Sequence, residues 1–410
     1  MPNRQQRNRN RNAAYRPPAS PQARPEVTVH LDDMANEGQA LGRVEGKVAF
    51  AAFGIPGEDV RLRVFTDKKQ FLSGDVIEVL TSSPHRVTPR CPHFGVCGGC
   101  QLQHVSYEQQ LVLKRRVVEE AVRRIGKLLD VTVHPTLPSR DPWQYRNHAR
   151  FSVTREGSAG FTHRNSHRFV PIDWCYIVHP WINKAKDALQ GAAAGSHQLD
   201  LRIGWNTGEY IVQPALEGDT RGFETGQESF TEVLGGVAFK VSAPSFFQVN
   251  TPQAERLVAI VRDRLGMRGT DTLVDAYAGV GVFAVLLAPF VSKVIAIEES
   301  HSAIEDALAN VQGYPHIQVI EGKTEDILPK LDVPADLVVL DPPRAGCFPQ
   351  VLDALAVAKF DTLPPTTVIS VLVKPSTSSL NWTTTGQVAR RDGSVTALVI
   401  VTLTWLGLYS

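Results

Sequence analysis

Short runs in which apolar and polar residues alternate occupy the first part of the chain after about residue 26. The runs VTVHL, GRVEGKVAF, EDVRLRVF and GDVIEVL lie between Val27 and Thr81. Alternation with a period of two and glycine breaks predict four or five short strands. Such strands over residues 26–82 fit a small barrel of the OB type, a module that commonly binds single-stranded nucleic acid, and other small β-barrels share this periodicity. The glycines expected at the breaks are Gly38, Gly46, Gly54 and Gly74.

The pattern changes after residue 83. Apolar residues follow helical spacing near residues 107–126, and most basic residues lie outside that apolar stripe. Residues 140–250 mix strand and loop patterns without a repeat. From Thr251 helical and strand patterns alternate, which predicts a doubly wound parallel sheet. We therefore expect an α/β multidomain protein with an OB-type barrel at 26–82, a central α+β domain at 83–250 and a Rossmann-like domain at 251–410.

The composition adds little to the prediction of the fold, but it bears on the cellular location of the protein. The chain has 410 residues, 43% of them hydrophobic, which suits ordinary water-exposed domains. It has no apolar run of about 18 residues and no apolar segment behind its charged N-terminus. We therefore expect a cytoplasmic monomer with no membrane partner. Residues 1–25 are rich in Arg, Asn and Pro, and a disordered basic tail is predicted there.

The distribution of charge is more informative than the net charge of +1. Residues 1–24 contain arginines and no acidic residue, and basic residues outnumber acidic ones between residues 83 and 150. Residues 298–341 are instead acidic. A basic front half suits a polyanionic partner such as RNA. A solvated helix face beside a disordered tail would give the same charges.

Three cysteines cluster in the segment CPHFGVCGGC, at Cys91, Cys97 and Cys100. In a reducing compartment such spacing indicates a metal or cluster site rather than disulfides. Gly98 and Gly99 are expected to let the backbone turn so that the thiols face one centre. A closed site needs a fourth ligand, and the distant Cys175 is the candidate. The spacing leaves open an iron–sulfur cluster, zinc, or thiols without a metal.

A glycine loop in the segment VDAYAGVGVF follows one predicted strand and opens a helix. Glycines there let the backbone approach a ligand at the helix N-terminus. Glu298 ends the next strand, where an acidic residue can bind both ribose hydroxyls of a nucleoside. Asp341, in the segment DPPR, ends another strand. Together these features indicate S-adenosyl-L-methionine (SAM) rather than a dinucleotide, although a vestigial pocket would keep the same pattern.

With these motifs in place, the sequence resembles the uracil-C5 RNA methyltransferases, which make 5-methyluridine in tRNA or 23S ribosomal RNA. The resemblance covers about residues 27–380. It implies a TRAM domain for the barrel, a 4Fe–4S cluster on the four cysteines with zinc as the lesser alternative, and RNA as partner. The segment SFFQVN is its most specific signature. The cofactor contacts it implies are Gln248, Tyr277, Glu298 and Asp341.

The resemblance fails at the catalytic nucleophile. Family members add a cysteine thiolate to C6 of uracil, which makes C5 nucleophilic, and a glutamate then removes the C5 proton. Aligned on Pro375, the cysteine position in VISVLVKPSTSS holds Val373. No cysteine follows Cys347, and no glutamate follows Glu325. We therefore expect impaired methyl transfer.

Three interpretations of this C-terminus remain. The chain is a diverged SAM- and RNA-binding protein without activity, or its sequence from about residue 362 derives from a shifted reading frame or a truncation. The Ser-, Thr- and Val-rich change after Asp361 favours the second. In the third, Cys347 in the loop after Asp341 has replaced the nucleophile, although a lone cysteine there is more often incidental.

Overall fold

The computed structural model describes residues 24–127, 129, 132–332, 335–343, 346–357, 367–371 and 398–401, which form two units. One unit holds the described residues up to Ala35 together with Gln39–Pro84. The other holds Asn36–Gly38 and the described residues from His85 onward. The expected disordered tail lies outside the described residues except for residues 24 and 25, and so does Val373.

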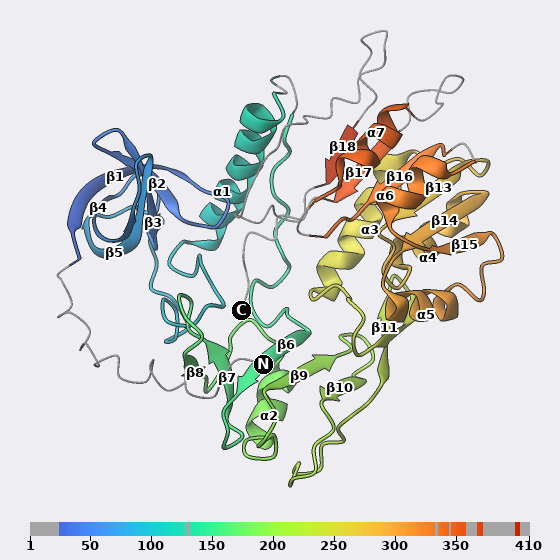
Figure 1. Cartoon of the computed structure of the whole chain (residues 1–410), viewed down its shortest axis with the longest axis horizontal. Helices are drawn as coiled ribbons and strands as arrows, with labels where there is room; N and C mark the ends of the chain where they lie inside the picture. Colours follow the sequence, from blue (N-terminus) through green and yellow to red (C-terminus); the bar gives the residue numbers. More distant parts are fainter. Residues whose placement is uncertain are drawn as a thin grey trace, which may run out of the picture. The chain divides into compact units, whose positions relative to one another are not determined.

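The first unit is a closed five-stranded barrel with the strand order β1-β2-β3-β5-β4, in which β4 also pairs with β1 (Figure 1). The strands β3 and β5 are parallel and the other pairs are antiparallel. The small barrel expected from the alternating pattern is confirmed. Its strands are β1 (Glu26–Met34), β2 (Ala40–Val44), β3 (Lys47–Ala52), β4 (Asp59–Asp67) and β5 (Phe71–Thr81).

The glycine breaks were right at three of four positions. Gly74 lies inside β5 instead of between two strands. A Cβ atom at this position would stand 2.1 Å from the backbone oxygen of Arg63 on β4. Gly74 is thus needed because two strands of the small barrel approach each other closely there. The sequence pattern alone does not distinguish such a glycine from one in a turn.

The second unit begins with the cysteine segment and the predicted helix, found as α1 (Tyr107–Glu120) and a π-helical turn (Ala121–Ile125). Lys114 was expected on the solvent side but is buried, and burial lowers the pKa of its ammonium group to about 8. An antiparallel sheet follows, with the order β10-β9-β6-β7-β8. Its elements are β6 (His148–Val153), β7 (Ala159–Thr162), β8 (Phe169–Pro171), α2 (Pro180–Ala188), β9 (Gln198–Ile203) and β10 (Tyr210–Gln213).

The parallel sheet expected in the C-terminal part is confirmed, with the order β15-β14-β13-β16-β17-β18. The hairpin of β11 (Ser229–Leu234) and β12 (Val237–Ser242) precedes it. The strands of the sheet are β13 (Thr272–Ala276), β14 (Lys293–Glu298), β15 (Ile317–Glu321), β16 (Leu337–Leu340), β17 (Thr367–Val371) and β18 (Leu398–Val401). The helices are α3 (Thr251–Leu265), α4 (Val282–Leu287), α5 (His301–Asn310), α6 (Thr324–Ile327), α7 (Pro349–Val357) and the 3-10 turns Ala288–Phe290 and Leu328–Lys330.

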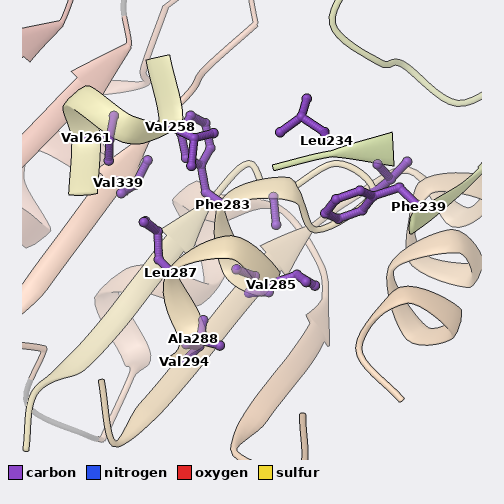
Figure 2. Close-up of a cluster of buried hydrophobic side chains, with 14 of the residues drawn as sticks. Leu234, Phe239, Val258, Val261, Phe283, Val285, Leu287, Ala288, Val294 and Val339 are labelled. Carbon is purple, nitrogen blue, oxygen red and sulfur yellow. The ribbon is translucent and has the colours of Figure 1, made fainter. Parts of the chain in front are cut away.

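Apolar side chains cover this sheet on both faces, as the continuous apolar strands predict. On one face, Val294 and Val339 pack against α3 and α4, and the β11–β12 hairpin adds Leu234 and Phe239 to the same cluster (Figure 2). On the other face, alternate strand residues pack against α7. The hairpin therefore shares its hydrophobic core with α3, α4 and the parallel sheet. Within the described residues, no helix is long and apolar enough to cross a membrane.

A buried carboxylate fastens the hairpin to the start of α3. Glu232 on β11 is 0% exposed, and its Oε2 accepts hydrogen bonds from the Trp205 amide at 2.7 Å and the Thr251 hydroxyl at 3.0 Å. Its Oε1 accepts from the amides of Asn206 and Val233, both at 3.0 Å. A buried charge is tolerated only when its hydrogen bonds are satisfied in this way.

We predict that Glu232→Ala lowers the free energy of unfolding by about 2–4 kcal/mol, because it leaves several buried donors without an acceptor. Urea denaturation followed by circular dichroism measures the change. The matched control is Glu228→Ala, at an exposed position just before the same strand. Equal stabilities for the two variants would show that the network does not hold the hairpin.

Candidate cofactor site and cysteine centre

The carboxyl ends of β13, β14 and β16 bring the predicted motif residues to one edge of the sheet. Tyr277 follows β13, Glu298 is the last residue of β14, and Asp341 follows β16 directly. The backbone amide of Asp341 donates to the Ala276 oxygen at 3.4 Å. Three of the four expected cofactor contacts thus lie at the edge where ligands bind in parallel sheets.

The loop between β13 and α4 turns sharply at this edge. Tyr277 has a φ of 67°, a backbone conformation that is uncommon for a bulky residue and typical of functional sites. The Gly279 amide donates to Glu298 Oε2 at 2.7 Å, and Glu298 Oε1 accepts from the amides of Glu299 and Ser300 at 3.0 and 2.8 Å. The carboxylate is therefore held in place before any ligand arrives.

Two further carboxyl groups at this edge are hard to ionise. Burial, followed by the nearby charges of Asp341 and Glu298, raises the pKa of Asp275 to about 7, and burial also raises the pKa of Asp341 to about 7. Asp275 Oδ2 accepts from the Ala284 amide at 2.8 Å, and its Oδ1 is buried with no partner among the described residues. Such a group of carboxyls favours a cationic ligand, which would lower both pKa values.

The fourth expected contact comes from the loop that carries SFFQVN. Gln248 Nε2 lies 3.4 Å from Asp341 Oδ2, a long hydrogen bond. The loop is held by Asn147, whose Nδ2 donates to the Gln248 oxygen at 3.0 Å, and by Arg202, whose Nη1 donates to the Ser245 oxygen at 2.8 Å. Asn147 and Arg202 were not found by sequence reasoning, because nothing local marks residues that act on a loop far along the chain.

Cys347 lies beside Tyr277, and the described residues around it give its thiol no feature of an activated nucleophile. Burial raises the pKa of its thiol to about 11. Burial, followed by the neighbouring Cys347, also raises the pKa of the Tyr277 hydroxyl. A reactive cysteine needs a lowered pKa and a cationic neighbour. The surroundings of Cys347 therefore argue against a replacement nucleophile.

The four predicted cysteine ligands line one cavity. Cys91, Cys97, Cys100 and Cys175 surround it together with His93. Its remaining wall is largely apolar and includes Phe94, Phe161, Ile172 and Ile177. Burial raises the pKa of all four thiols, that of Cys97 to about 11 and that of Cys100 to about 12. The sequence-predicted set is thus brought together although Cys175 is distant along the chain.

Hydrogen-bond donors point at each of the four sulfur atoms. Backbone amides of His93 and Phe94 approach Cys91, and the amide of Gly99 approaches Cys97. The Gln103 side chain approaches Cys100. The amides of Ile177 and Val178 approach Cys175. All these contacts favour thiolates, the form that binds metals, and amides directed at cysteine sulfurs are typical of metal and iron–sulfur sites.

The cysteine loop is pinned to the β7–β8 connection. The Gly98 amide donates to the Thr162 oxygen at 3.0 Å, and a Cβ atom on Gly98 would lie 3.3 Å from the Arg164 Cα. Gly98 thus permits a close approach, whereas the left-handed residue of this loop is Gly95, with a φ of 88°. The expected turn at Gly98 and Gly99 is confirmed, and Cys97 and Cys100 on either side of it line the same cavity. The sequence did not show that Gly98 also meets another segment.

A second clamp fixes Cys175. Asn183 on α2 accepts from the Cys175 amide through Oδ1 at 2.8 Å and donates to the Cys175 oxygen through Nδ2 at 2.9 Å. The buried Lys186, one turn further on, donates to the Ile172 oxygen at 2.7 Å. Because both residues belong to one helix, the position of the fourth thiol is set by α2.

The spacing of the thiols bears on the kind of metal group that fits. Among the described residues, no set of three or more His, Cys, Asp or Glu side chains is arranged to hold a metal ion. Four ligands of one zinc ion would need sulfur atoms about 4 Å apart, given a Zn–S bond of about 2.3 Å.

Comparison with known proteins agrees with this arrangement. Residues 232–381 match the family described as tRNA (Uracil-5-)-methyltransferase, and residues 23–77 match the TRAM domain. An uncharacterized RNA methyltransferase of Thermosynechococcus vestitus is 33% identical over 80% of this chain and 85% of its own length. A second, of Halalkalibacterium halodurans, is 32% identical over 86% and 88%. The chain belongs to the RNA (uracil-5-)-methyltransferase family.

A solved structure supports this assignment. The Pyrococcus abyssi tRNA (uracil-54, C5)-methyltransferase in complex with S-adenosyl-L-homocysteine is 25% identical, covers 81% of this chain and 88% of its own, and has a TM-score of 0.63. The predicted TRAM barrel, the methyltransferase fold and the SAM-dependent RNA methyltransferase class are therefore confirmed for this family member.

We predict that Asp275→Asn removes a pH-dependent loss of stability. A carboxyl whose pKa is raised on folding stabilises the folded state below its unfolded pKa of 3.8, and this is lost as the pH rises towards about 7. The stability of the variant relative to the original should thus rise between pH 4 and pH 7, by up to about 4 kcal/mol at 1.36 kcal/mol per pKa unit. Urea midpoints across this range, with the exposed Asp263→Asn as control, measure it. A flat difference would contradict the raised pKa.

Proposed function

We propose that this chain binds SAM at the carboxyl edge of β13, β14 and β16, and that its reaction is methyl transfer to C5 of a uridine in 23S ribosomal RNA or tRNA. The observation that carries the proposal is the group of carboxyls at this edge, two of which have raised pKa values. SAM supplies an electrophilic methyl group on a positively charged sulfonium. A cation is the ligand that such an edge binds best.

The four residues at this edge have different roles in the proposal. Glu298 accepts hydrogen bonds from the ribose hydroxyls of the nucleoside, because backbone amides already fix the orientation of its carboxylate. Gln248 and Asp341, in contact with each other, bind the methyl donor from the side of the SFFQVN loop. Tyr277, in its unusual backbone conformation, walls the site next to Cys347.

The four cofactor-edge residues do not supply the nucleophile and the base that methyl transfer to C5 of uracil needs. Attack on C6 needs a thiolate and loss of the C5 proton needs a base, and the sequence has Val373 at the cysteine position and no glutamate after Glu325. Cys347 is buried with a raised pKa, so it does not fill the gap. The chain therefore binds the methyl donor and RNA but transfers the methyl group slowly or not at all.

A second candidate function follows from the same gap: a non-catalytic SAM- and RNA-binding protein. In both candidates the TRAM barrel and the basic residues of the front half would hold the RNA phosphates, whereas only methyl transfer needs the target base flipped into the pocket. The nucleotide sequence around codons 360–380 separates the two candidates. If a change of reading frame there restores a Ser-Cys-x-Pro motif and a later glutamate, the chain derives from an active methyltransferase rather than from a non-catalytic binding protein.

The cysteine cavity holds a 4Fe–4S cluster in this proposal, with zinc as the lesser alternative. Cys91, Cys97, Cys100 and Cys175 are its ligands, and the support is the shared cavity with donors directed at each sulfur. The cluster, when bound, supplies iron–thiolate bonds that tie the segment of residues 91–100 to α2. Its role is structural, beside the path of the RNA.

The division of the chain follows from these assignments. We place a TRAM barrel at residues 26–82, a central cysteine-bearing domain at 83–250 and the methyltransferase domain at 251–410, acting as a monomer. The boundary at Thr251 marks where helices and strands begin to alternate. The β11–β12 hairpin lies before this boundary, yet it contributes Leu234 and Phe239 to the methyltransferase core.

We predict binding without turnover. Calorimetry should detect S-adenosylhomocysteine binding, whereas methyl incorporation from labelled SAM into unmodified ribosomal RNA and tRNA should be at least about 10³-fold slower than in a relative that keeps both the cysteine and the glutamate. Robust, site-specific 5-methyluridine would refute the inactivity. Cys347→Ala, which tests the replacement nucleophile, should leave any residual incorporation unchanged.

We also predict that the purified chain is brown and contains iron and acid-labile sulfide. Asn183→Leu, which removes both hydrogen bonds to the Cys175 backbone, should speed iron loss to a chelator by about tenfold, as expected when a partner that orients a ligand is removed. The control is Asn165→Leu, at an exposed position outside the cavity. Zinc without iron would refute the cluster.

A further inference from the structure

One side chain of the cysteine cavity has a polar atom that the protein leaves unsatisfied. His93 lines the cavity with the four cysteines, and its Nε2 is buried with no hydrogen-bond partner among the described residues. Leaving a buried polar atom unpaired costs about 1–3 kcal/mol. Because native proteins rarely accept this cost, such an atom indicates a partner that belongs in the cavity.

The cavity wall offers His93 few acceptors other than sulfur. Phe161, Ile172 and Ile177 are apolar there. The side-chain oxygen of Gln103 already accepts from the Cys91 amide at 3.1 Å, and its amide group is used by Cys100. Among the side chains that line the cavity, the cysteine sulfurs and the Tyr176 hydroxyl remain as acceptors, and the four sulfurs are the more numerous.

We propose that His93 donates an Nε2–H hydrogen bond to a sulfur of the cluster, either a cysteine thiolate or a bridging sulfide, and so sets the cluster's reduction potential. The inference rests on the proposed 4Fe–4S cluster. A hydrogen bond to sulfur stabilises the reduced, more negative cluster more than the oxidised one, which raises the potential. The backbone amides that donate to the cysteine sulfurs cannot be removed by changing a side chain. His93 and Gln103 are therefore the donors that a substitution can remove.

The test compares reduction potentials of the cluster in the full-length protein. Each variant is reduced in steps with dithionite, which delivers one electron per cluster, and is followed by electron paramagnetic resonance and visible absorption under argon. His93→Leu removes the donor, and His93→Gln keeps an N–H group at a similar reach. His197→Leu, at an exposed position outside the cavity, is the control.

We expect His93→Leu to lower the ratio of reduced to oxidised cluster about tenfold at a fixed potential, which for one electron is a shift of about 59 mV. His93→Gln should stay near the original value, and His197→Leu should not change it. Equal potentials in the Leu and Gln variants would overturn the proposal and leave His93 as packing alone.

Iron and sulfide content separates this result from failure of the cluster assignment. An original protein without iron refutes the cluster itself. If only His93→Leu loses its cluster while His93→Gln retains one near the original potential, the donor role is supported. If both variants lose the cluster, the hydrogen bond is not what His93 contributes, and the proposal fails.

Discussion

A single short segment, residues 144–147, connects the two sites of this methyltransferase. On one side its backbone pairs with the segment after Cys175: the Gln144 amide donates to the Tyr176 oxygen and the Arg146 amide to the Ile177 oxygen, both at 2.9 Å. On the other side the Asn147 amide donates to the Val249 oxygen at 2.9 Å. Backbone hydrogen bonds of residues 144–147 thus connect the loop that presents Gln248 to the segment after the fourth cysteine.

The Asn147 side chain completes this connection. Its Nδ2 contacts the Gln248 oxygen and the Thr251 hydroxyl, and Thr251 in turn donates to the buried Glu232. A rearrangement of the cysteine centre would therefore act on the cofactor loop through this hydrogen-bonded network. The fold therefore couples the cysteine cavity to the loop that presents Gln248.

The two sites follow one electrostatic rule. At the sheet edge, burial holds carboxyls such as Asp275 close to neutral, and in the cysteine cavity it holds thiols such as Cys100 protonated. In both places a positive partner would favour the charged form of the ligand groups. The fold thus keeps the acidic groups of both sites in a low dielectric, where they are hard to ionise without a positive partner.

Sequence reasoning succeeded where a motif is local and failed where contacts are distant. Glu298 and Asp341 could be placed because each ends an apolar strand, and parallel strands end at one edge. Cys175 was found only because cysteines are few. Asn147, Arg202 and the unpaired His93 nitrogen gave no signal, since their importance arises from packing between segments far apart in the chain. Val373 remains an inference from sequence, outside the described residues.

The closed barrel has a consequence for how such proteins evolve. Each of its five strands has a neighbour on both sides, so it exposes no strand edge that must be paired by the rest of the protein. Gain or loss of the module at a junction near Pro84 would leave no broken sheet to repair. The barrel can therefore be gained, lost or exchanged as a unit while the strand pairing of the methyltransferase sheet stays unchanged.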